Sequence, residues 1–596
     1  MTRSPEYNPG IARLKRPSRD MRVLLLHPED TPFDRRWSAS HWDLIVDLGW
    51  AGRSQYQVWT KQLACPVRAL FGFADWQQDV RQIQQMLQLG NGRLVDAEGI
   101  DWWALLAPGA FQRFYEFWLL QKLAREIGTS PELYVTRAHP WTETLAKLLG
   151  TKATTLSGSP QNGFASRLRR YRTALRTLTP RQLTMIAGDK WDTDYRIRRF
   201  LATKRKSEPG AKVLLPSAYR NVSRIAVSYA SLLPKKSFLL VTTRADGFLA
   251  NLPRNVQAVT LAAYAQVPRI QSTEREIAAL SARWKVLKEN LQQAQDPALT
   301  YAAGLFADLP RALRNGLRIR DAWRKVFERE SISAVLCGDE NNPYTRLPVL
   351  LARKRGVWTI NCSHGALDIT VMLRGPCADV YLAKGEMEQD YLVEQCGVPR
   401  ERIFVGAPPL ECRPARESRG TDIVFFSEPY ELYFGRTETF YRELLPNLCE
   451  VARKHSRKVV LKLHPFESAR ARSNLVDHVL AGSDRRLVEI SAEPMSQRLL
   501  QRTWFGVTVE SSTAVECAVA GVPCFLCGWF DLDLHAYGKQ YQKFGAAQIL
   551  DRHTDILRIP DSLGLAPRPE ATERLHHPIT PGDLKTIMQT RDIVQA

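Results

Sequence analysis

The sequence predicts an α/β protein made of several lobes, each with a parallel sheet covered by helices. Three observations lead to this fold class. Short apolar runs alternate with helical patterns along most of the chain, which is typical of parallel α/β units. The chain has 596 residues, too many for one hydrophobic core, and this length indicates roughly three or four domains. Its 44% hydrophobic and 24% charged residues are the fractions of a globular protein.

The apolar runs and the polar stretches between them divide the chain into five segments. Residues 1–20 are predicted to be a disordered basic tail, and residues 21–210 an N-terminal α/β region with a basic helical linker. Residues 211–415 and 416–560, named here the middle lobe and the third lobe, each contain a series of strands, and residues 561–596 are a C-terminal tail. The predicted strands include "MRVLLL", "WDLIVDLG" and "ELYV" in the first region, "AKVLL", "SFLLVT", "ISAVLC", "GVWTIN", "ADVYLA" and "ERIFV" in the middle lobe, and "TDIVFF", "KVVLKL", "RLVEIS", "WFGVTV" and "VPCFL" in the third lobe.

The N-terminus and the cysteines predict a cytoplasmic protein. The first residues are basic and lack the apolar core of a signal peptide, and no apolar run approaches the ~18 to 20 residues of a membrane span. The ten cysteines lie mostly within apolar segments, which suits buried free thiols. Cys524 and Cys527 are the only close pair, and no second pair has the spacing of zinc ligands. We therefore expect no metal and no cofactor.

The net charge of +21 indicates a polyanionic partner, such as a nucleic acid, an anionic membrane surface or an acidic substrate. Much of the charge lies in two Arg-rich stretches, residues 166–210 and 311–327. In the second stretch Leu313, Leu317 and Trp323 mark an apolar helical stripe, so its arginines are equally well explained as the solvated face of a helix. No helix-turn-helix, zinc-finger or RNA-recognition signature accompanies the charge, which disfavours nucleic acid. An anionic inner-membrane surface, bound peripherally, remains among the expected partners.

Two strands of the third lobe end in polar residues that suit a phosphate group. The first strand ends with Lys462 and His464, and the second is followed by the hydroxyl residues Ser511, Ser512 and Thr513. Ligands of parallel α/β folds bind at the carboxyl edge of the sheet, where hydroxyls and N–H groups at the start of a helix favour an anion. We expect the two strands to be neighbours in one sheet, with their polar ends together.

Ordinary loop chemistry is an equally good explanation of these polar ends. Thr513 and Glu516 have the spacing of a T-x-x-E capping box at the start of a helix that ends at Gly521. The His-Pro dipeptide also follows strands at His27 and His139, where proline simply ends a strand.

The same residues resemble a known family. "STAVECAVAGVPCFL" is similar to the T-x-x-E-x4-G-x-P segment in the donor domain of GT-B glycosyltransferases. The His-Pro and Ser-Ser-Thr pair resembles the motifs of bacterial Kdo transferases, sialyltransferases and polysialyltransferases of capsule synthesis. The middle-lobe stretches "GDENNPYTRLPVLLARKRGVWTINCSHGALD" and "ADVYLAKGEMEQDYLVEQCGVPRERIFVGAPP" resemble CDP-glycerol glycerophosphotransferases and UDP-sugar 2-epimerases. The resemblance covers roughly Lys212 to Leu550.

The resemblance implies a GT-B fold, with two Rossmann-like lobes of parallel sheets, a cleft between them and an extra N-terminal α/β and helical region. It implies a metal-independent, inverting glycosyltransferase that moves a sugar from a CMP-, CDP- or UDP-linked donor such as CMP-Kdo to a capsular, cell-surface or lipid-linked glycan. The middle lobe is then the acceptor side and the third lobe the donor side. The matching residues are His464, Ser511, Ser512 and Thr513 for the donor phosphate, Glu516 for the ribose, and His364 as the catalytic base. By position alone, Lys462 is expected beside the phosphate, and Asp339 or Glu340, at the end of a middle-lobe strand, are alternative bases.

Each of these residues also has a structural explanation. His364 can simply cap or pack the turn before Gly365, and Asp339 and Glu340 can belong to a solvated turn. Two other functions stay open at this point. One is a UDP-sugar 2-epimerase, which would act on the donor without an acceptor. The other is a non-enzymatic, membrane-associated partner of surface-glycan assembly.

Overall fold

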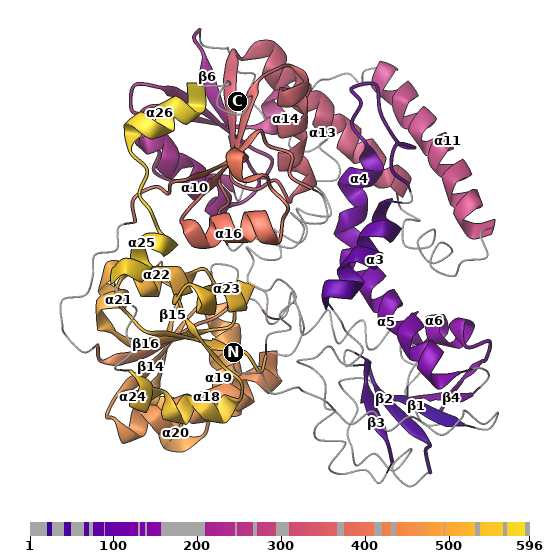
Figure 1. Cartoon of the computed structure of the whole chain (residues 1–596), viewed down its shortest axis with the longest axis vertical. Helices are drawn as coiled ribbons and strands as arrows, with labels where there is room; N and C mark the ends of the chain where they lie inside the picture. Colours follow the sequence, from indigo (N-terminus) through magenta and orange to yellow (C-terminus); the bar gives the residue numbers. More distant parts are fainter. Residues whose placement is uncertain are drawn as a thin grey trace. The chain divides into compact units, whose positions relative to one another are not determined.

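The computed structural model describes residues 21–26, 41–48, 65–70, 76–88, 90–128, 131–136, 140–156, 209–244, 247–265, 271–293, 309–365, 375–410, 420–428, 430, 437–464, 467–493, 495–530, 537–563 and 569–589. They form two compact units (Figure 1): the first holds the described residues of 21–86 and 111–156, and the second holds those of 87–110 and 209–589. The predicted tail over 1–20, residues 166–208 of the Arg-rich stretch, residues 411–419 between the lobes, and both His27 and His139 lie outside the described residues.

The first unit contains a five-stranded parallel sheet with the strand order β3-β2-β1-β4-β5. Its elements are β1 (Arg22–Leu26), β2 (Leu44–Asp47), β3 (Val67–Ala69), α3 (Trp76–Gln88), α5 (Phe111–Ile127), β4 (Glu132–Val135), α6 (Pro140–Leu148) and β5 (Ala153–Thr155). β1 has parallel partners on both sides, and the four leucine and valine residues that follow Arg22 in it are fully buried. A near-continuous apolar run is what such a central strand requires.

The middle lobe is built on a seven-stranded parallel sheet with the order β12-β11-β10-β9-β6-β7-β8. Its elements are β6 (Lys212–Ser217), α10 (Arg220–Ser231), β7 (Ser237–Thr242), β8 (Val256–Thr260), η4 (Leu261–Tyr264), α11 (Gln271–Gln293), α13 (Leu309–Arg329), β9 (Ile332–Cys337), α14 (Pro343–Lys354), β10 (Trp358–Asn361), β11 (Val380–Ala383), α16 (Glu386–Glu394), η5 (Arg400–Arg402) and β12 (Ile403–Val405). The order along the chain reverses between β6 and β9, as in Rossmann-like sheets.

The third lobe carries a six-stranded parallel sheet with the order β15-β14-β13-β16-β17-β18. Its elements are β13 (Asp422–Phe426), α18 (Thr437–Lys454), β14 (Lys458–Lys462), α19 (Ala469–Val479), α20 (Gly482–Leu487), β15 (Val488–Ser491), α21 (Gln497–Arg502), β16 (Thr503–Thr508), α22 (Thr513–Val519), β17 (Cys524–Cys527), α23 (Tyr537–Lys543), β18 (Gln548–Leu550), η6 (His553–Arg558) and α24 (Ile559–Ser562). Numbered from β13, this is the Rossmann order 3-2-1-4-5-6, with its switch point between β13 and β16.

Residues 87–110 pack with α11 and α13 in the second unit, although the sequence analysis assigns them to the N-terminal region. The guanidinium of Arg320 donates to Asp96 at 2.7 Å and to Glu276 at 2.7 Å, and the indole of Trp102 donates to the same Asp96 at 2.8 Å. Trp102 also lies so close to Gly316 that any side chain there would clash with its ring. Arg320 is only 2% exposed, so the explanation of the α13 arginines as a solvated face is wrong for this residue.

The end of the described chain returns to the middle lobe. Residues 569–589, which the sequence analysis treats as a tail, contain α25 (Pro569–Leu575) and α26 (Pro581–Gln589). Pro578 forms a parallel bridge with Ala407, and the indole of Trp358 in β10 donates to the carbonyl of Ile587 at 2.8 Å. Leu584, Ile587 and Met588 are buried within the middle-lobe core.

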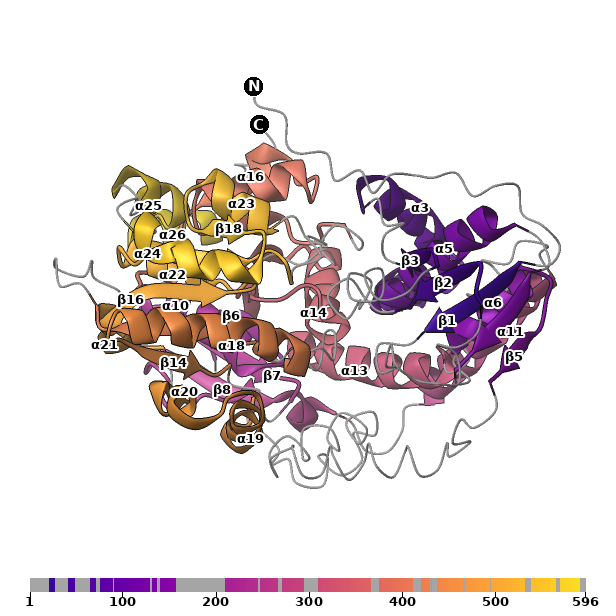
Figure 2. The same cartoon turned by 90° about the horizontal axis from the view of Figure 1, so that it is seen from below.

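The middle and third lobes contact each other through α16, α23 and α25, which lie side by side in both views (Figure 2). Gln540 donates to the carbonyl of Met387 at 3.0 Å, and Lys543 pairs with Asp390 at 2.6 Å. Gly385, just before α16, lies against the backbone of α25: an added Cβ would stand 2.4 Å from the Arg574 carbonyl oxygen. Only glycine fits this approach.

The predicted fold class is confirmed. The second unit contains two Rossmann-like lobes of parallel strands, the architecture of the GT-B type, and the first unit holds the parallel sheet of the extra N-terminal region. Among the helices that the structure describes, none is long and apolar enough to cross a membrane.

Candidate functional site

The two polar strand ends of the third lobe lie at one sheet edge but are not on neighbouring strands. β14 and β16 both pair with β13, which lies between them. The expectation that β14 and β16 are neighbours in the sheet is therefore wrong, because one strand separates them. The carboxyl end of β13, with Ser427, lies between His464 and the Ser511 loop, at the edge where the strand order reverses. This is the position at which Rossmann-like sheets bind ligands.

His464 is held as a neutral imidazole just after β14. Its backbone N–H donates to a carboxylate oxygen of Glu467 at 2.6 Å, which fixes the turn after the strand. Burial, and to a smaller extent the positive charge of Lys462, lower the pKa of His464 to about 4. At neutral pH the ring is therefore uncharged, with one of its two nitrogens protonated and the other not.

Glu467 organises this edge of the sheet, and sequence reasoning did not identify it. Its side chain is almost fully buried and pairs with the equally buried Arg472 at 2.6 Å. It also accepts a hydrogen bond from the hydroxyl of Ser427 at 2.7 Å. Burial raises the pKa of Glu467, and the neighbouring donors and Arg472 oppose that rise. Its position three residues after His464 was the only available signal.

The Ser-Ser-Thr loop leads into α22, whose limits are close to the predicted ones. The T-x-x-E capping box is not formed, because the N-cap residue is Ser512 and its side chain makes no capping hydrogen bond. The Thr513 hydroxyl oxygen is buried and has no hydrogen-bond partner among the described residues. The Val522 N–H donates to the Cys517 carbonyl at 2.8 Å, while Gly521 has a φ of +74°. This is the Schellman arrangement that ends a helix.

Glu516, in the first turn of α22, is influenced by cations of both lobes. Burial raises the pKa of its carboxyl group, and the charges of Arg224, Lys462 and Lys384 oppose the rise, in that order. Arg224 belongs to α10 after β6, and Lys384 follows β11. Cations that lie at or after strand ends of both sheets therefore act on the carboxyl group of Glu516. Burial also lowers the pKa of Lys462, and the two carboxyl groups of Glu467 and Glu516 oppose this effect.

His364 follows β10 in the middle lobe, and its ring orientation is fixed. Its Nδ1 lies 2.9 Å from the Gly338 carbonyl oxygen, which also accepts the backbone N–H of His364 at 3.1 Å. A carbonyl can only accept, so a neutral His364 carries its proton on Nδ1. Its Nε2 is then the unprotonated nitrogen, as a general base requires.

The two alternative bases have other roles in the middle lobe. A carboxylate oxygen of Asp339 accepts the backbone N–H groups of Asn341 and Asn342 at 2.9 and 3.2 Å, which stabilises the turn before α14. Glu340 is 2% exposed and accepts from the Tyr381 hydroxyl at 2.8 Å and from the Cys377 thiol at 3.0 Å. Neither is the predicted solvated turn residue, since both are buried.

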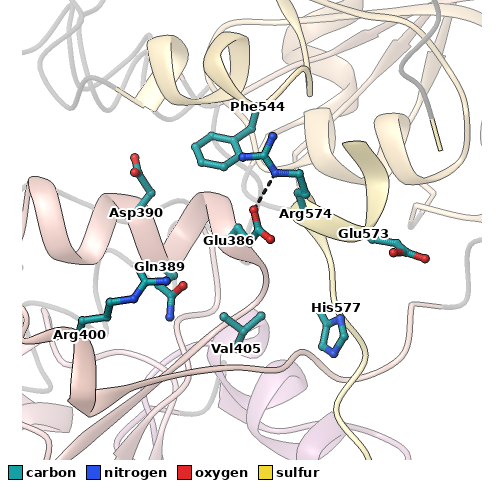
Figure 3. A pocket seen from close by; sticks show the side chains of 9 residues that line it. All are labelled: Glu386, Gln389, Asp390, Arg400, Val405, Phe544, Glu573, Arg574 and His577. Atoms are coloured by element: carbon teal, nitrogen blue, oxygen red, sulfur yellow. Dashed lines mark hydrogen bonds and ion pairs between the residues drawn. The ribbon is translucent and has the colours of Figure 1, made fainter. Parts of the chain in front are cut away.

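A separate cavity of about 420 Å³ lies beside α16 and α25 (Figure 3). Glu386 pairs with Arg574 across it at 2.7 Å, and the Arg574 guanidinium stacks on the ring of Phe544. Its lining is Glu386, Gln389, Asp390, Arg400, Val405, Phe544, Glu573, Arg574 and His577. None of the predicted site residues lines this cavity, so it belongs to the contact between the lobes rather than to the candidate site.

Within the described ranges, no three His, Cys, Asp or Glu side chains lie close enough together to hold a metal ion. Cys524 and Cys527 are buried free thiols at the two ends of β17.

No protein-family model matches the chain, and no curated protein matches it. Similar solved structures include S. aureus MnaA with UDP (12% identity, covering 62% of this chain and 92% of that one, TM-score 0.37) and the spinosyn rhamnosyltransferase SpnG (14%, 64% and 100%, 0.38). A UDP-GlcNAc 2-epimerase from Neisseria meningitidis bound to UDP-GlcNAc is a third (12%, 64% and 99%, 0.36).

Proposed function

We propose that the protein is an inverting, metal-independent glycosyltransferase that transfers a sugar from a nucleotide-activated donor to a capsular, cell-surface or lipid-linked glycan. The donor is a CMP-sugar such as CMP-Kdo, or a CDP- or UDP-linked sugar. The observation that supports the proposal most is the electrostatic link between the lobes: Glu516 of the third lobe responds to Arg224 and Lys384, which follow strands of the middle lobe. A nucleotide held at one sheet edge would thus face an acceptor held at the other.

Each side chain has a defined part in the proposed reaction. Nε2 of His364 takes the proton of an acceptor hydroxyl, whose oxygen attacks the anomeric carbon as the bond to the donor phosphate breaks. The neutral His464 and the hydroxyls of Ser511, Ser512 and Thr513 donate hydrogen bonds to the leaving phosphate, beside the ammonium of Lys462. Glu516 accepts hydrogen bonds from the ribose hydroxyls.

The first experiment is a thermal-shift panel with CMP, CDP, UDP and GDP. A nucleotide present at 100 times its Kd stabilises the folded protein by about 2.7 kcal/mol, so the preferred nucleotide should give the largest rise in Tm. Release of CMP from CMP-Kdo or CMP-sialic acid, or of UDP from UDP-GlcNAc, with and without a lipid-linked glycan extract, then tests transfer. Conversion of UDP-GlcNAc alone would indicate an epimerase instead, and no nucleotide binding would leave a non-enzymatic partner of glycan assembly.

Removal of the phosphate-binding side chains should weaken nucleotide binding. We expect His464→Ala and Ser512→Ala each to raise the Kd for the preferred nucleotide about tenfold to a hundredfold, the value of a hydrogen bond to a charged group. Isothermal titration calorimetry gives the Kd, and the Tm without nucleotide should change little. His478→Ala, which removes an exposed histidine of the same lobe, is the matched control. Wild-type affinity in both site variants would refute this phosphate site.

The stability of His464→Ala also reports the protonation state. Because folding lowers the pKa of His464 from 6.5 to about 4, the unfolded chain takes up this proton first as the pH falls. His464 therefore destabilises the folded wild type progressively below pH 6.5, with the full effect reached near pH 4. We expect the variant to lose less stability than the wild type across this pH window.

The Arg-rich stretch over residues 166–210 is expected to bind anionic surfaces, as proposed for a peripheral inner-membrane enzyme. Vesicles that contain phosphatidylglycerol should bind the protein, and salt should weaken the binding because exposed charges are screened over ~8 to 10 Å at physiological ionic strength. Replacing Arg169, Arg170, Arg198 and Arg199 with Gln should reduce vesicle co-sedimentation. Equal binding to phosphatidylcholine vesicles would show that the charge is incidental.

A further inference from the structure

We propose that Lys384 and Glu388 are positioning residues that hold the His364 turn in place for proton transfer. This inference rests on the proposed function, because it concerns the base of the same reaction. Sequence reasoning assigned no role to either residue.

The Lys384 ammonium joins the His364 turn to α16. It donates to the carbonyl of Gly365, the residue after His364, at 3.3 Å, and to a carboxylate oxygen of Glu388 at 2.6 Å. The side chains of Lys384 and Glu388 are 18% and 5% exposed. A charge pair this well buried stays in one geometry, unlike an exposed pair whose side chains keep their rotamer freedom.

The backbone of Lys384 is itself fixed. The second carboxylate oxygen of Glu388 accepts the Lys384 N–H at 2.8 Å, and the Lys384 carbonyl accepts the N–H of His577 at 2.8 Å. Gly385 allows no side chain against the backbone of Leu575. The backbone of Lys384 is therefore fixed at its N–H and at its carbonyl, and Glu388 fixes its ammonium. The side chain can thus hold the His364 turn in one position.

Among the described residues, the turn over His364 and Gly365 is held from two sides, and the Ser363 hydroxyl adds a long contact of 3.5 Å to the Gly365 carbonyl. His364 bonds to the Gly338 carbonyl on one side, and the Gly365 carbonyl accepts from Lys384 on the other. Loss of the Lys384 bond would let the turn move relative to Gly338. A shift of about 1 Å in a catalytic group can cost about a hundredfold in rate.

The test uses the full chain and the donor turned over in the panel described above, CMP-Kdo being the first choice. Because Lys384→Met alone leaves the buried Glu388 unpaired, the main variant is Lys384→Met with Glu388→Gln, whose amide oxygen can still accept the Lys384-position N–H. We expect kcat to fall about tenfold to a hundredfold, a larger effect than the change in donor KM that loss of the Lys384 charge near Glu516 brings. Lys384→Arg should restore part of the rate.

Adding His364→Asn to the main variant should lower kcat no further than His364→Asn alone, because the pair acts through His364. The control is Lys543→Met, which breaks the ion pair between Lys543 of α23 and Asp390 of α16, the helix that also carries Glu388.

Crystal structures of the wild type and of the main variant give a readout that does not depend on activity. The distance of 2.9 Å between His364 Nδ1 and the Gly338 carbonyl oxygen should be kept in the wild type and lost in the variant. An unchanged contact, or a fall in kcat that adds fully to that of His364→Asn, would overturn the inference. If no donor in the panel is turned over, the proposed function fails, and the crystallographic distance alone decides the positioning role.

Discussion

Replacing His364 with alanine should lower kcat about 10² to 10⁴-fold, equal to about 3 to 5 kcal/mol of barrier, while nucleotide affinity stays near the wild-type value. The reason is geometric: Gly338 holds the proton of the ring on Nδ1, so Nε2 is the nitrogen that can accept the proton of a substrate hydroxyl. His364 belongs to the middle lobe, whereas the residues proposed for the nucleotide belong to the third lobe. Steady-state transfer rates and calorimetric Kd values measured on the same preparation separate the two effects.

A second substitution controls for the structural role of His364. His364→Asn keeps a side-chain N–H that can donate to the Gly338 carbonyl but has no basic nitrogen, so we expect a folded and equally inactive protein. If His364→Asn transfers sugar at nearly the wild-type rate, the base lies elsewhere, and Asp339→Asn becomes the next variant. Glu340 is a weaker alternative, since its carboxylate oxygens already accept from Tyr381 and Cys377.

Replacing Glu467 with alanine should destabilise the protein by about 3 to 5 kcal/mol, because it leaves the Arg472 guanidinium buried without its partner. It also removes the acceptor of the His464 N–H and of the Ser427 hydroxyl, so nucleotide binding should weaken at temperatures where the variant is folded. Urea denaturation without nucleotide measures the loss of stability from the shift in midpoint at constant m-value.

The matched control is Glu438→Ala, which breaks the pair with Arg442 at 2.8 Å on the surface of α18. Because the side chains of Glu438 and Arg442 are both about half exposed, this change should lower the free energy of unfolding by about 0 to 1 kcal/mol. Replacing Glu467 and Arg472 together with methionine removes both buried charges and should recover most of the stability. A cost for Glu467→Ala no larger than that for Glu438→Ala would show that the buried pair is not a stabilising unit.

The strands and their polar ends could be predicted because their causes are local. Runs such as "KVVLK" and "TWFGVT" have no place other than the interior of a parallel sheet, and β14 and β16 coincide with them. Strand order is a different matter, because it depends on how the chain crosses over between distant strands. The hydrophobic periodicity of the sequence does not indicate that β13 lies between β14 and β16.

The parts of the candidate site that sequence did not reveal depend on tertiary contacts. The spacing of Thr513 and Glu516 fits a capping box, yet Glu516 lies instead in a region influenced by cations of the other lobe. Arg320 looks like one of many surface arginines, but Asp96 and Glu276 bury it from elements distant in sequence. Lys384 lies at an unremarkable strand end, and only the structure places its ammonium beside the Gly365 carbonyl.

The return of α26 to the middle lobe has a consequence for the order in which the chain folds during synthesis. Leu584, Ile587 and Met588 complete the middle-lobe core, but they are translated after the whole third lobe. Until they emerge from the ribosome, the core surface beside Trp358 lacks the packing that α26 provides. The described strands of the third-lobe sheet, by contrast, all come from one continuous stretch of chain. During synthesis, the third lobe can therefore complete its core before the middle lobe does, although the middle lobe comes first in the sequence.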